Sequence, residues 1–174
     1  MTTLSVSTDF LQQIGRVTVL QSHIEGQLAV FIRDLLRLAS SDGDILTAQM
    51  SFGIRLKTVH SLLLSRLGSQ HEYFKEFEAI QKDIARLEQA RNTFVHSMWG
   101  FGSTLKSDTA TRVKVASSSG AGARMQSVPV HIDELRELAN EMEQREWAVS
   151  NLRVKVCHQG GLCDNSTSNS PHPP

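Results

Sequence analysis

Residues 72–98 read EYFKEFEAIQKDIARLEQARNTFVHSM, a pattern that predicts one long amphipathic helix ending near Trp99 and Gly100. The apolar side chains recur at steps of three and four residues, which is the spacing of one face of an α-helix. The members of this stripe are Phe77, Ile80, Ile84, Leu87, Phe94 and Met98. Arg91 stands where a further apolar residue is due. A guanidinium there lowers stability unless it is paired, so this helix is expected to carry a site.

Polar side chains flank Arg91 along the same helix. Asn92 and His96 are four residues apart, and Glu88 lies one turn earlier, so a polar strip is expected beside the arginine. Each residue also has an ordinary structural explanation, in which Arg91 pairs with Glu25 or Glu88 and His96 caps the helix end. The combination of amide, imidazole and guanidinium favours a functional site.

The first part of the chain predicts two more helices. One runs from about Asp9 to Leu38 and would be roughly 45 Å long at about 1.5 Å per residue, so it is expected to need a partner. The other carries its apolar stripe from Phe52 to Leu63 and stops at Gly68. Residues 40–44, SSDGD, predict a turn between the two. Ser69–Glu72 has the spacing of a capping box and is expected to open the helix over 72–98.

The second part predicts a hairpin and a fourth helix. Alternating polar and apolar residues over 101–107 and 109–117 predict an antiparallel hairpin, with a flexible Ser/Gly/Ala loop at 117–123. Pro129 precedes the fourth helix, which is expected to start near His131 or Ile132.

Four amphipathic helices with short connections predict a mainly all-α fold, namely an antiparallel four-helix bundle with the hairpin inserted at about 101–128. One such domain is expected over residues 1–156. The segment 157–174 is rich in Gly, Ser, Asn and Pro, which is typical of a disordered tail without chemistry. Cys157 and Cys163 match no zinc module and are expected to remain thiols in a reducing cytosol.

The composition is that of an ordinary globular protein, with 40% hydrophobic residues and a formal net charge of zero. Zero net charge argues against binding nucleic acid through a global positive field but leaves room for a local basic patch. Lys106, Arg112 and Lys114 make the hairpin locally basic, and Trp99 offers a ring for base stacking; a solvated hairpin and a closed core explain the same residues. With no signal peptide or membrane span in the sequence, we expect a cytoplasmic protein without membrane contact.

Neither a metal nor a cofactor is expected. Di-iron bundles need Glu three residues before His on two helices. The residues at that spacing before His60, His71, His96 and His131 are Lys57, Gly68, Thr93 and Val128. Gly100 to Gly102 follows a helix rather than a strand, so it does not predict a phosphate-binding loop.

The segment ARNTFVHSMWGFG resembles the signature of the HEPN superfamily, the higher eukaryotes and prokaryotes nucleotide-binding domains. In that signature an Arg and a polar residue, here Arg91 and Asn92, are followed after three more residues by a His, here His96. Glu25 in HIEGQLAVFIRDLL also resembles an acidic position of small bacterial members. The resemblance spans residues 8–156. It implies a homodimeric, metal-independent endoribonuclease fold in which two motifs meet across the interface, with some members lacking activity.

The chemistry of the residues agrees with that implication. Cleavage of RNA through its own 2′-hydroxyl needs a base, an acid and positive charge against the crowded phosphorane. Histidine is the residue type that most readily takes or gives a proton near neutral pH, which suits His96 to this chemistry. Arg91 offers a fork of donors to phosphate oxygens, and Asn92 can orient His96 or the phosphate through neutral hydrogen bonds. In a two-fold dimer, one His96 can act as the base and the other as the acid.

Two classes of function therefore stay open. The first is an endoribonuclease, such as a toxin or phage-defence nuclease, with a cognate antitoxin or regulatory protein as a further partner. The second is a non-catalytic module for dimerisation or for protein or nucleotide binding. The intact motif favours the first class, and the neutral net charge favours the second.

Overall fold

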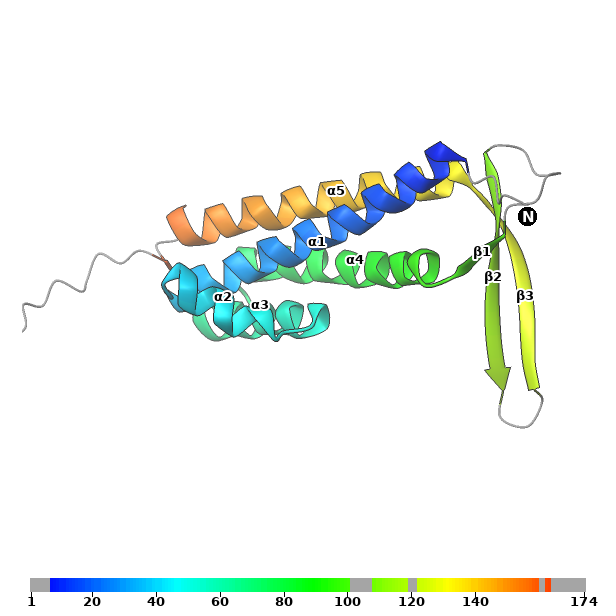
Figure 1. The fold of residues 1–174 in the computed structure, drawn as a ribbon. Helices are drawn as coiled ribbons and strands as arrows, with labels where there is room; N and C mark the ends of the chain where they lie inside the picture. The colour runs from blue at the N-terminus through cyan, green and yellow to red at the C-terminus, as the bar shows by residue number, and fades with distance from the viewer. Residues whose placement is uncertain (1–6, 101–107, 119–121, 160–161, 164–174) are drawn as a thin grey trace, which may run out of the picture. The chain divides into compact units, whose positions relative to one another are not determined.

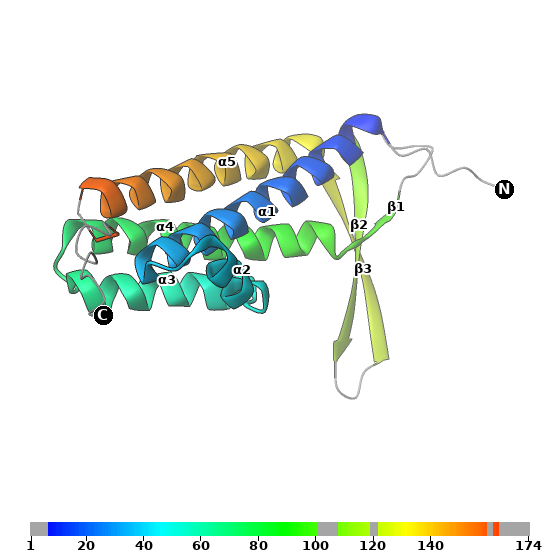
Figure 2. The same cartoon turned by 60° about the vertical axis from the view of Figure 1, so that its left-hand side comes forward.

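The computed structural model describes residues 7–100, 108–118, 122–159 and 162–163. It is mainly helical with one three-stranded antiparallel sheet (Figures 1 and 2). The elements are α1 (Thr8–Leu36), α2 (Ser40–Ala48), α3 (Phe52–Leu67), α4 (Glu72–Val95), β1 (Met98–Gly100), β2 (Thr109–Ser118), β3 (Gly122–His131), α5 (Ile132–Val154) and a π-helical turn, η1 (Lys155–Gln159).

The chain divides into two compact parts. We call Met1–Gln21 with Arg86–Gln144 the sheet unit, and Ser22–Ala85 with Arg145–Pro174 the helical unit. Each has its own apolar core, built from the stripes that the periodicity predicts. Core residues of the sheet unit include Phe10, Val17, Leu87, Ala110, Val130, Leu135, Leu138 and Met142. Those of the helical unit include Leu28, Phe31, Leu35, Leu56, Val59, Leu63, Phe77, Val149 and Leu152.

The sheet unit contains an antiparallel hairpin, as predicted, but its second strand, β3, covers residues for which no strand was predicted. β2 and β3 pair antiparallel from Thr109 opposite His131 to Ser118 opposite Gly122. The strands therefore continue through most of the segment expected to be a loop, because Ser117 pairs with Ala123. Residues 101–107, where a strand was expected, lie outside the described residues. Instead β1 supplies the third strand, with Trp99 opposite Arg112 of β2.

The helix over 72–98 ends earlier than the periodicity predicts. α4 stops at Val95, and Met98 is 63% exposed in β1 rather than part of the apolar stripe. The reason lies in how the last carbonyls are satisfied. Trp99 Nε1 donates to the Phe94 carbonyl at 3.0 Å, and Ser97 Oγ donates to the Thr93 carbonyl at 2.5 Å. These side-chain donors satisfy terminal carbonyls and allow the chain to leave the helix.

In the helical unit, the turn predicted at 40–44 is wrong, because these residues open helix α2. Ser, Asp and Gly are weak helix formers, so tertiary contacts must stabilise this helix. Gly43 is buried, and a Cβ added to it would lie 2.5 Å from Cγ of Arg33. Arg55 Nη2 donates to the Thr47 carbonyl at 3.0 Å near the end of α2. Close packing and this hydrogen bond are not visible in the local sequence.

In the helical unit, the predicted end of α3 at Gly68 is confirmed, whereas the predicted capping box at the start of α4 is wrong. α3 ends before Gly68, which has φ 79°, a left-handed conformation that glycine adopts easily. α4 begins at Glu72, so Ser69 is too far upstream to cap it. The cap is His71, whose Nδ1 accepts from the Tyr73 N–H at 3.2 Å. Both ribbon views show α3 running beside the first half of α4 (Figures 1 and 2). The His60 and Phe74 rings are in contact between these helices, with their centroids 5.0 Å apart.

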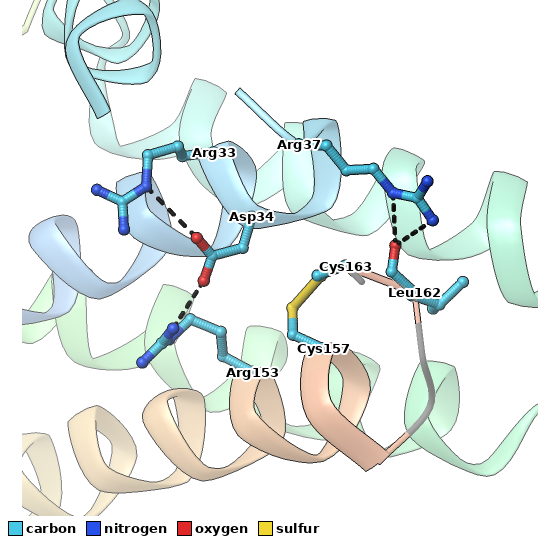
Figure 3. Close-up of a disulfide and its surroundings, with 7 residues drawn as sticks. All are labelled: Arg33, Asp34, Arg37, Arg153, Cys157, Leu162 and Cys163. Carbon is cyan, nitrogen blue, oxygen red and sulfur yellow. Dashed lines mark hydrogen bonds and ion pairs between the residues drawn. A yellow bond between two sulfur atoms is a disulfide. The ribbon is translucent and has the colours of Figure 1, made fainter. Parts of the chain in front are cut away.

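The cysteines form a disulfide, so the expectation of free thiols is wrong (Figure 3). Helical structure runs past the predicted boundary at 156 through η1, and Cys157 is buried in it. Cys163 is bonded to Cys157, and Arg37 donates through Nε and Nη2 to the neighbouring Leu162 carbonyl, both at 3.3 Å. Burial of the first cysteine, which composition does not reveal, anchors a segment expected to be disordered. The rest of that segment, 164–174, lies outside the described residues.

Within the described residues, no helix combines the length and the apolar character that crossing a bilayer requires.

Candidate functional site

Arg91 lies in the last turn of α4, one turn after the buried Leu87. Its side chain is half-buried, and Nε is shielded from solvent with no hydrogen-bond partner. Nη1 donates to Asn92 Oδ1 at 2.7 Å. The structure thus brings Arg91 and Asn92 together, as the sequence predicts for the polar strip. A neutral amide oxygen leaves the positive charge of the guanidinium uncompensated.

Among the described side chains, three other arginines of the sheet unit form ion pairs. They are Arg16 with Glu143 at 2.5 Å, Arg136 with Asp133 at 2.8 Å, and Arg86 with Glu141. By contrast, no carboxylate of the described residues pairs with Arg91 or Arg112. Both of these arginines also have a buried Nε without a hydrogen-bond partner. Two partly desolvated cations without counter-charges are suited to an anion from outside the chain.

His96 lies one residue beyond α4 and is exposed. Its backbone N–H still donates to the Asn92 carbonyl at 3.2 Å, so the helical turn continues to this residue. The expectation that His96 sits within the helix is wrong by one residue. No hydrogen bond joins the imidazole to Arg91 or Asn92 among the described contacts.

The two supporting carboxylates lie in different units. Glu25 belongs to the helical unit, where its carboxylate is 3.6 Å from Arg55 and its carbonyl accepts from the same guanidinium at 3.2 Å. Glu88 is half-buried on α4, one turn before Arg91 and Asn92. A supporting role for either carboxylate at Arg91 stays a prediction.

The residues expected to contact RNA differ in their surroundings, and the structure does not describe all of their side chains. Trp99 is engaged inside the sheet unit, where its ring centroid lies 5.3 Å from that of Phe10 and 6.3 Å from that of Phe94. This is the core-closing role that an aromatic at a helix end often has. Arg112 faces the same side of the sheet as Trp99, because the two are paired in register. Lys106 lies outside the described residues, and Lys114 is placed only by its pairing with Gln126.

A cavity of about 370 Å³ lies in the sheet unit between α4, the two long strands and the start of α5. Sequence reasoning missed it, since its lining comes from three separate segments. The α4 residues Arg86, Gln89 and Thr93 follow one another at spacings of three and four, and Ala90 and Phe94 are spaced by four beside them. Arg112 and Val128 contribute from the sheet. The only signal in the sequence was the basic character of the hairpin.

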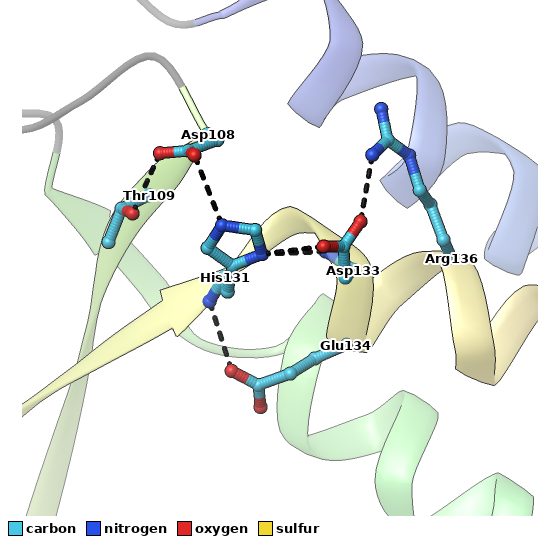
Figure 4. Close-up of polar contacts among 6 residues, drawn as sticks. All are labelled: Asp108, Thr109, His131, Asp133, Glu134 and Arg136. Atoms are coloured by element: carbon cyan, nitrogen blue, oxygen red, sulfur yellow. Dashed lines mark hydrogen bonds and ion pairs between the residues drawn. The ribbon is translucent and has the colours of Figure 1, made fainter.

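A second polar cluster joins the hairpin to α5 (Figure 4). His131 lies between two carboxylates, with Nε2 3.1 Å from Asp108 Oδ2 and Nδ1 3.1 Å from Asp133 Oδ2, and Nδ1 is also 3.3 Å from the Asp133 backbone nitrogen. The hydrogen bond from His131, followed by one from Thr109, lowers the pKa of the Asp108 carboxyl. The His131 N–H donates to Glu134 Oε1 at 3.0 Å. These contacts cap α5 and fix the end of the hairpin.

Within the described part of the chain, no group of three or more His, Cys, Asp or Glu side chains is arranged to hold a metal ion. Comparison of the chain with protein-family models, curated proteins and solved structures found no match.

Proposed function

We propose that this protein is a metal-independent endoribonuclease that works as a homodimer, with its long helices forming a HEPN-type four-helix bundle. One observation carries the proposal: Arg91 is a half-buried cation whose hydrogen-bond partner is the neutral Asn92, while no described carboxylate pairs with it. Maintaining such a charge costs stability, and phosphate oxygens would compensate it. The resemblance of Arg91, Asn92 and His96 to the HEPN signature supports the same reaction.

The reaction assigns one role to each side chain. His96 takes the proton from the 2′-hydroxyl, whose oxygen bonds to the adjacent phosphorus. Arg91 holds the equatorial phosphate oxygens as negative charge accumulates, and Asn92 orients the guanidinium through the bond from Nη1. The bond from phosphorus to the 5′-oxygen then breaks, and that oxygen receives a proton from the protonated imidazole of His96 in the second copy of the chain. The products are a 2′,3′-cyclic phosphate and a 5′-hydroxyl.

A second copy of the chain completes the site in this proposal. Residues 91 and 96 are five positions apart, so their side chains diverge by roughly 140° around the helix axis. One chain therefore offers the guanidinium and the imidazole in different directions, and a two-fold axis brings a second set to the same phosphate. Light scattering at micromolar concentration is expected to give a dimer mass. A stable monomer that cleaves RNA would contradict the composite site.

Cleavage of single-stranded RNA in EDTA tests the activity. Wild-type protein is expected to leave 2′,3′-cyclic phosphate ends, and His96→Ala is expected to lower the rate by about 10²–10⁴-fold, the usual effect of losing a positioned acid or base. Arg91→Ala is expected to be similarly inactive. His23→Ala, which removes another exposed histidine, is the control and should cleave normally. If wild type cleaves and the His96 and Arg91 variants match its rate, these residues are not the catalytic site.

The alternative is a module that binds RNA or a protein partner, such as an antitoxin, without cleaving. The absence of a described hydrogen bond from the His96 ring to Arg91 or Asn92 favours it, because this imidazole is not oriented in advance for catalysis. Binding of RNA that remains intact after prolonged incubation, with the affinity reduced in Arg91→Ala, would identify this class instead.

A further inference from the structure

The cavity in the sheet unit has the composition of a ligand site. Its volume of about 370 Å³ lies in the usual range for small-molecule sites. It combines an aromatic ring, Phe94, and two valines, Val128 and Val130, with the polar side chains of Gln89 and Thr93. One of its cations, Arg112, has no described ion pair.

The strand register directs Arg112 into this cavity. Ala110 and Val130 are paired in the sheet and are almost fully buried, so their face of the hairpin is the inner one. Side chains alternate along a strand, so Arg112 lies on the same inner face as Ala110. Val128 is opposite Arg112 on that face. The guanidinium is therefore held toward α4 rather than projecting into solvent.

Arg112 has no ion-pair partner among the described residues, although the Glu134 carboxylate also lines the cavity. The other lining arginine, Arg86, is paired with Glu141. The lining carboxylate, Glu134, accepts the His131 N–H through Oε1 at 3.0 Å. Arg112 has a buried Nε without a hydrogen-bond partner and no described carboxylate to pair with. An anionic group bound in the cavity would give Arg112 both a counter-charge and a hydrogen-bond acceptor for its Nε.

The cavity also adjoins the proposed catalytic histidine. Gln89, Thr93 and His96 are spaced by four and three residues, and the helical turn continues to His96, so the three share one side of α4. Thr93 and His96 are separated by about 4.5 Å along the helix axis, at about 1.5 Å per residue. An RNA strand whose reactive phosphate lies at His96 would therefore place a neighbouring nucleotide in the cavity.

We infer that this cavity binds the nucleotide flanking the cleaved bond of an RNA strand. Arg112 holds its phosphate, and the base packs against Phe94 and Val128. Every nucleotide of single-stranded RNA has a base that can stack on an aromatic ring and a phosphate that can accept hydrogen bonds from a guanidinium. The inference rests on the proposed function for its register relative to His96, but binding in the cavity is measurable without cleavage.

The experiment measures binding of a fluorescein-labelled, non-cleavable 2′-fluoro RNA oligonucleotide by anisotropy in EDTA, over a range of salt concentrations. Arg112→Gln is expected to weaken binding about tenfold. It should also reduce the slope of log affinity against log salt by about 0.7, the value for one phosphate contact on a single strand. Arg112→Lys keeps the charge and should restore the slope but only part of the affinity. Arg16→Gln removes a paired arginine of the same unit and serves as the control.

The outcomes separate the two proposals. If folded Arg112→Gln protein binds with the wild-type affinity and salt slope, the cavity is not an RNA site, whatever the cleavage assay shows. Equal losses in Arg112→Gln and Arg16→Gln would also overturn the inference, because any surface cation would then serve. Arg112-dependent binding of RNA that the wild type never cleaves would support the cavity and contradict the nuclease proposal.

Discussion

Arg55 of the helical unit and Arg91 of the sheet unit begin from similar positions. Both lie half-buried on a helix, and both have a buried Nε without a hydrogen-bond partner. Arg55 nevertheless has a counter-charge, because it lies 3.6 Å from the Glu25 carboxylate, and it donates to the Glu25 and Thr47 carbonyls at 3.2 and 3.0 Å. Arg91 has the Asn92 amide oxygen at 2.7 Å. The first arginine ties helices together, whereas the second keeps its charge for another group.

This difference teaches that burial of an arginine does not identify a site by itself. What separates a structural guanidinium from a functional one is whether the protein supplies the counter-charge. Arg112 belongs with Arg91 by this criterion, although it lies on a strand rather than a helix.

The largest effect is expected from Arg55→Ala. The substitution removes an ion pair and two carbonyl contacts, and it should lower the free energy of unfolding by about 2–3 kcal/mol, less than for a fully buried pair because Glu25 is partly exposed. Arg91→Ala should change it by no more than about 1 kcal/mol, since no ion pair is lost. Urea denaturation of both variants measures the contrast. Equal destabilisation would mean that Arg91 is also structural.

A substitution at Gly43 tests the packing of α2 against Arg33 in the helical unit. In Gly43→Ala the new Cβ would lie 2.5 Å from Cγ and 2.9 Å from Cβ of Arg33, so a helix or side chain must shift. We expect a loss of about 1–3 kcal/mol, typical of overpacking. Gly26→Ala is the control, because nothing lies within 4 Å and a helical alanine should stabilise by about 0.5–1 kcal/mol. If the melting temperatures of Gly43→Ala and Gly26→Ala shifted in the same direction, the close packing of Gly43 against Arg33 would be contradicted.

Asn92→Asp would make Arg91 resemble Arg55. A carboxylate where Oδ1 now accepts from Nη1 strengthens that bond, while a negative charge in the last turn of a helix is unfavourable. The two effects are similar in size, so the unfolding free energy should change by less than about 1 kcal/mol. RNA cleavage should fall at least about tenfold, because the guanidinium is neutralised internally. Unchanged cleavage would show that the free charge of Arg91 is not used.

The smallest effects are expected at exposed contacts and have opposite pH dependence in the two units. The folded pKa of Asp108 is lowered, chiefly by the His131 hydrogen bond, so its stabilising contact is present above pH about 4 and is lost as pH falls through that lowered value. The pKa of Lys155 is raised, chiefly by the hydrogen bond to Glu76, so its contact is present below pH about 10.4 and is lost as pH rises through the raised value.

Carboxyl and side-chain NMR titrations would follow each contact separately. Asp108→Asn should remove the acid transition of the sheet unit and leave the alkaline transition at Lys155 in place. An acid transition that persists in Asp108→Asn would have to arise from another carboxyl group.

Much of the fold could be predicted because it depends on local periodicity. The stripes of α1, α3 and α5 are read directly from residues such as Leu28, Leu56 and Leu135, which are all buried. The errors fall where distant residues decide the structure. α2 forms because Gly43 allows contact with Arg33, and α4 ends where the Trp99 indole takes the Phe94 carbonyl.

The candidate site could be predicted only as far as one helix extends. Arg91 and Asn92 are adjacent in the sequence, and the structure adds a hydrogen bond between their side chains that the sequence did not predict. The cavity could not be predicted, because Arg112 reaches α4 through the strand register rather than through sequence proximity. The disulfide of Cys157 was not predicted, and the burial of this cysteine is not visible in the sequence either.

The pairing of β1, β2 and β3 limits how this protein can change during evolution. Deleting one residue from β2 before Arg112 would exchange the two faces of the strand and turn the guanidinium away from α4. Deleting or inserting two residues would restore the original face. Near the far end of the hairpin, beyond the pairs that set Arg112, length can vary without this penalty. Insertions and deletions in related chains should therefore occur in even steps before Arg112 and in any number toward the hairpin tip.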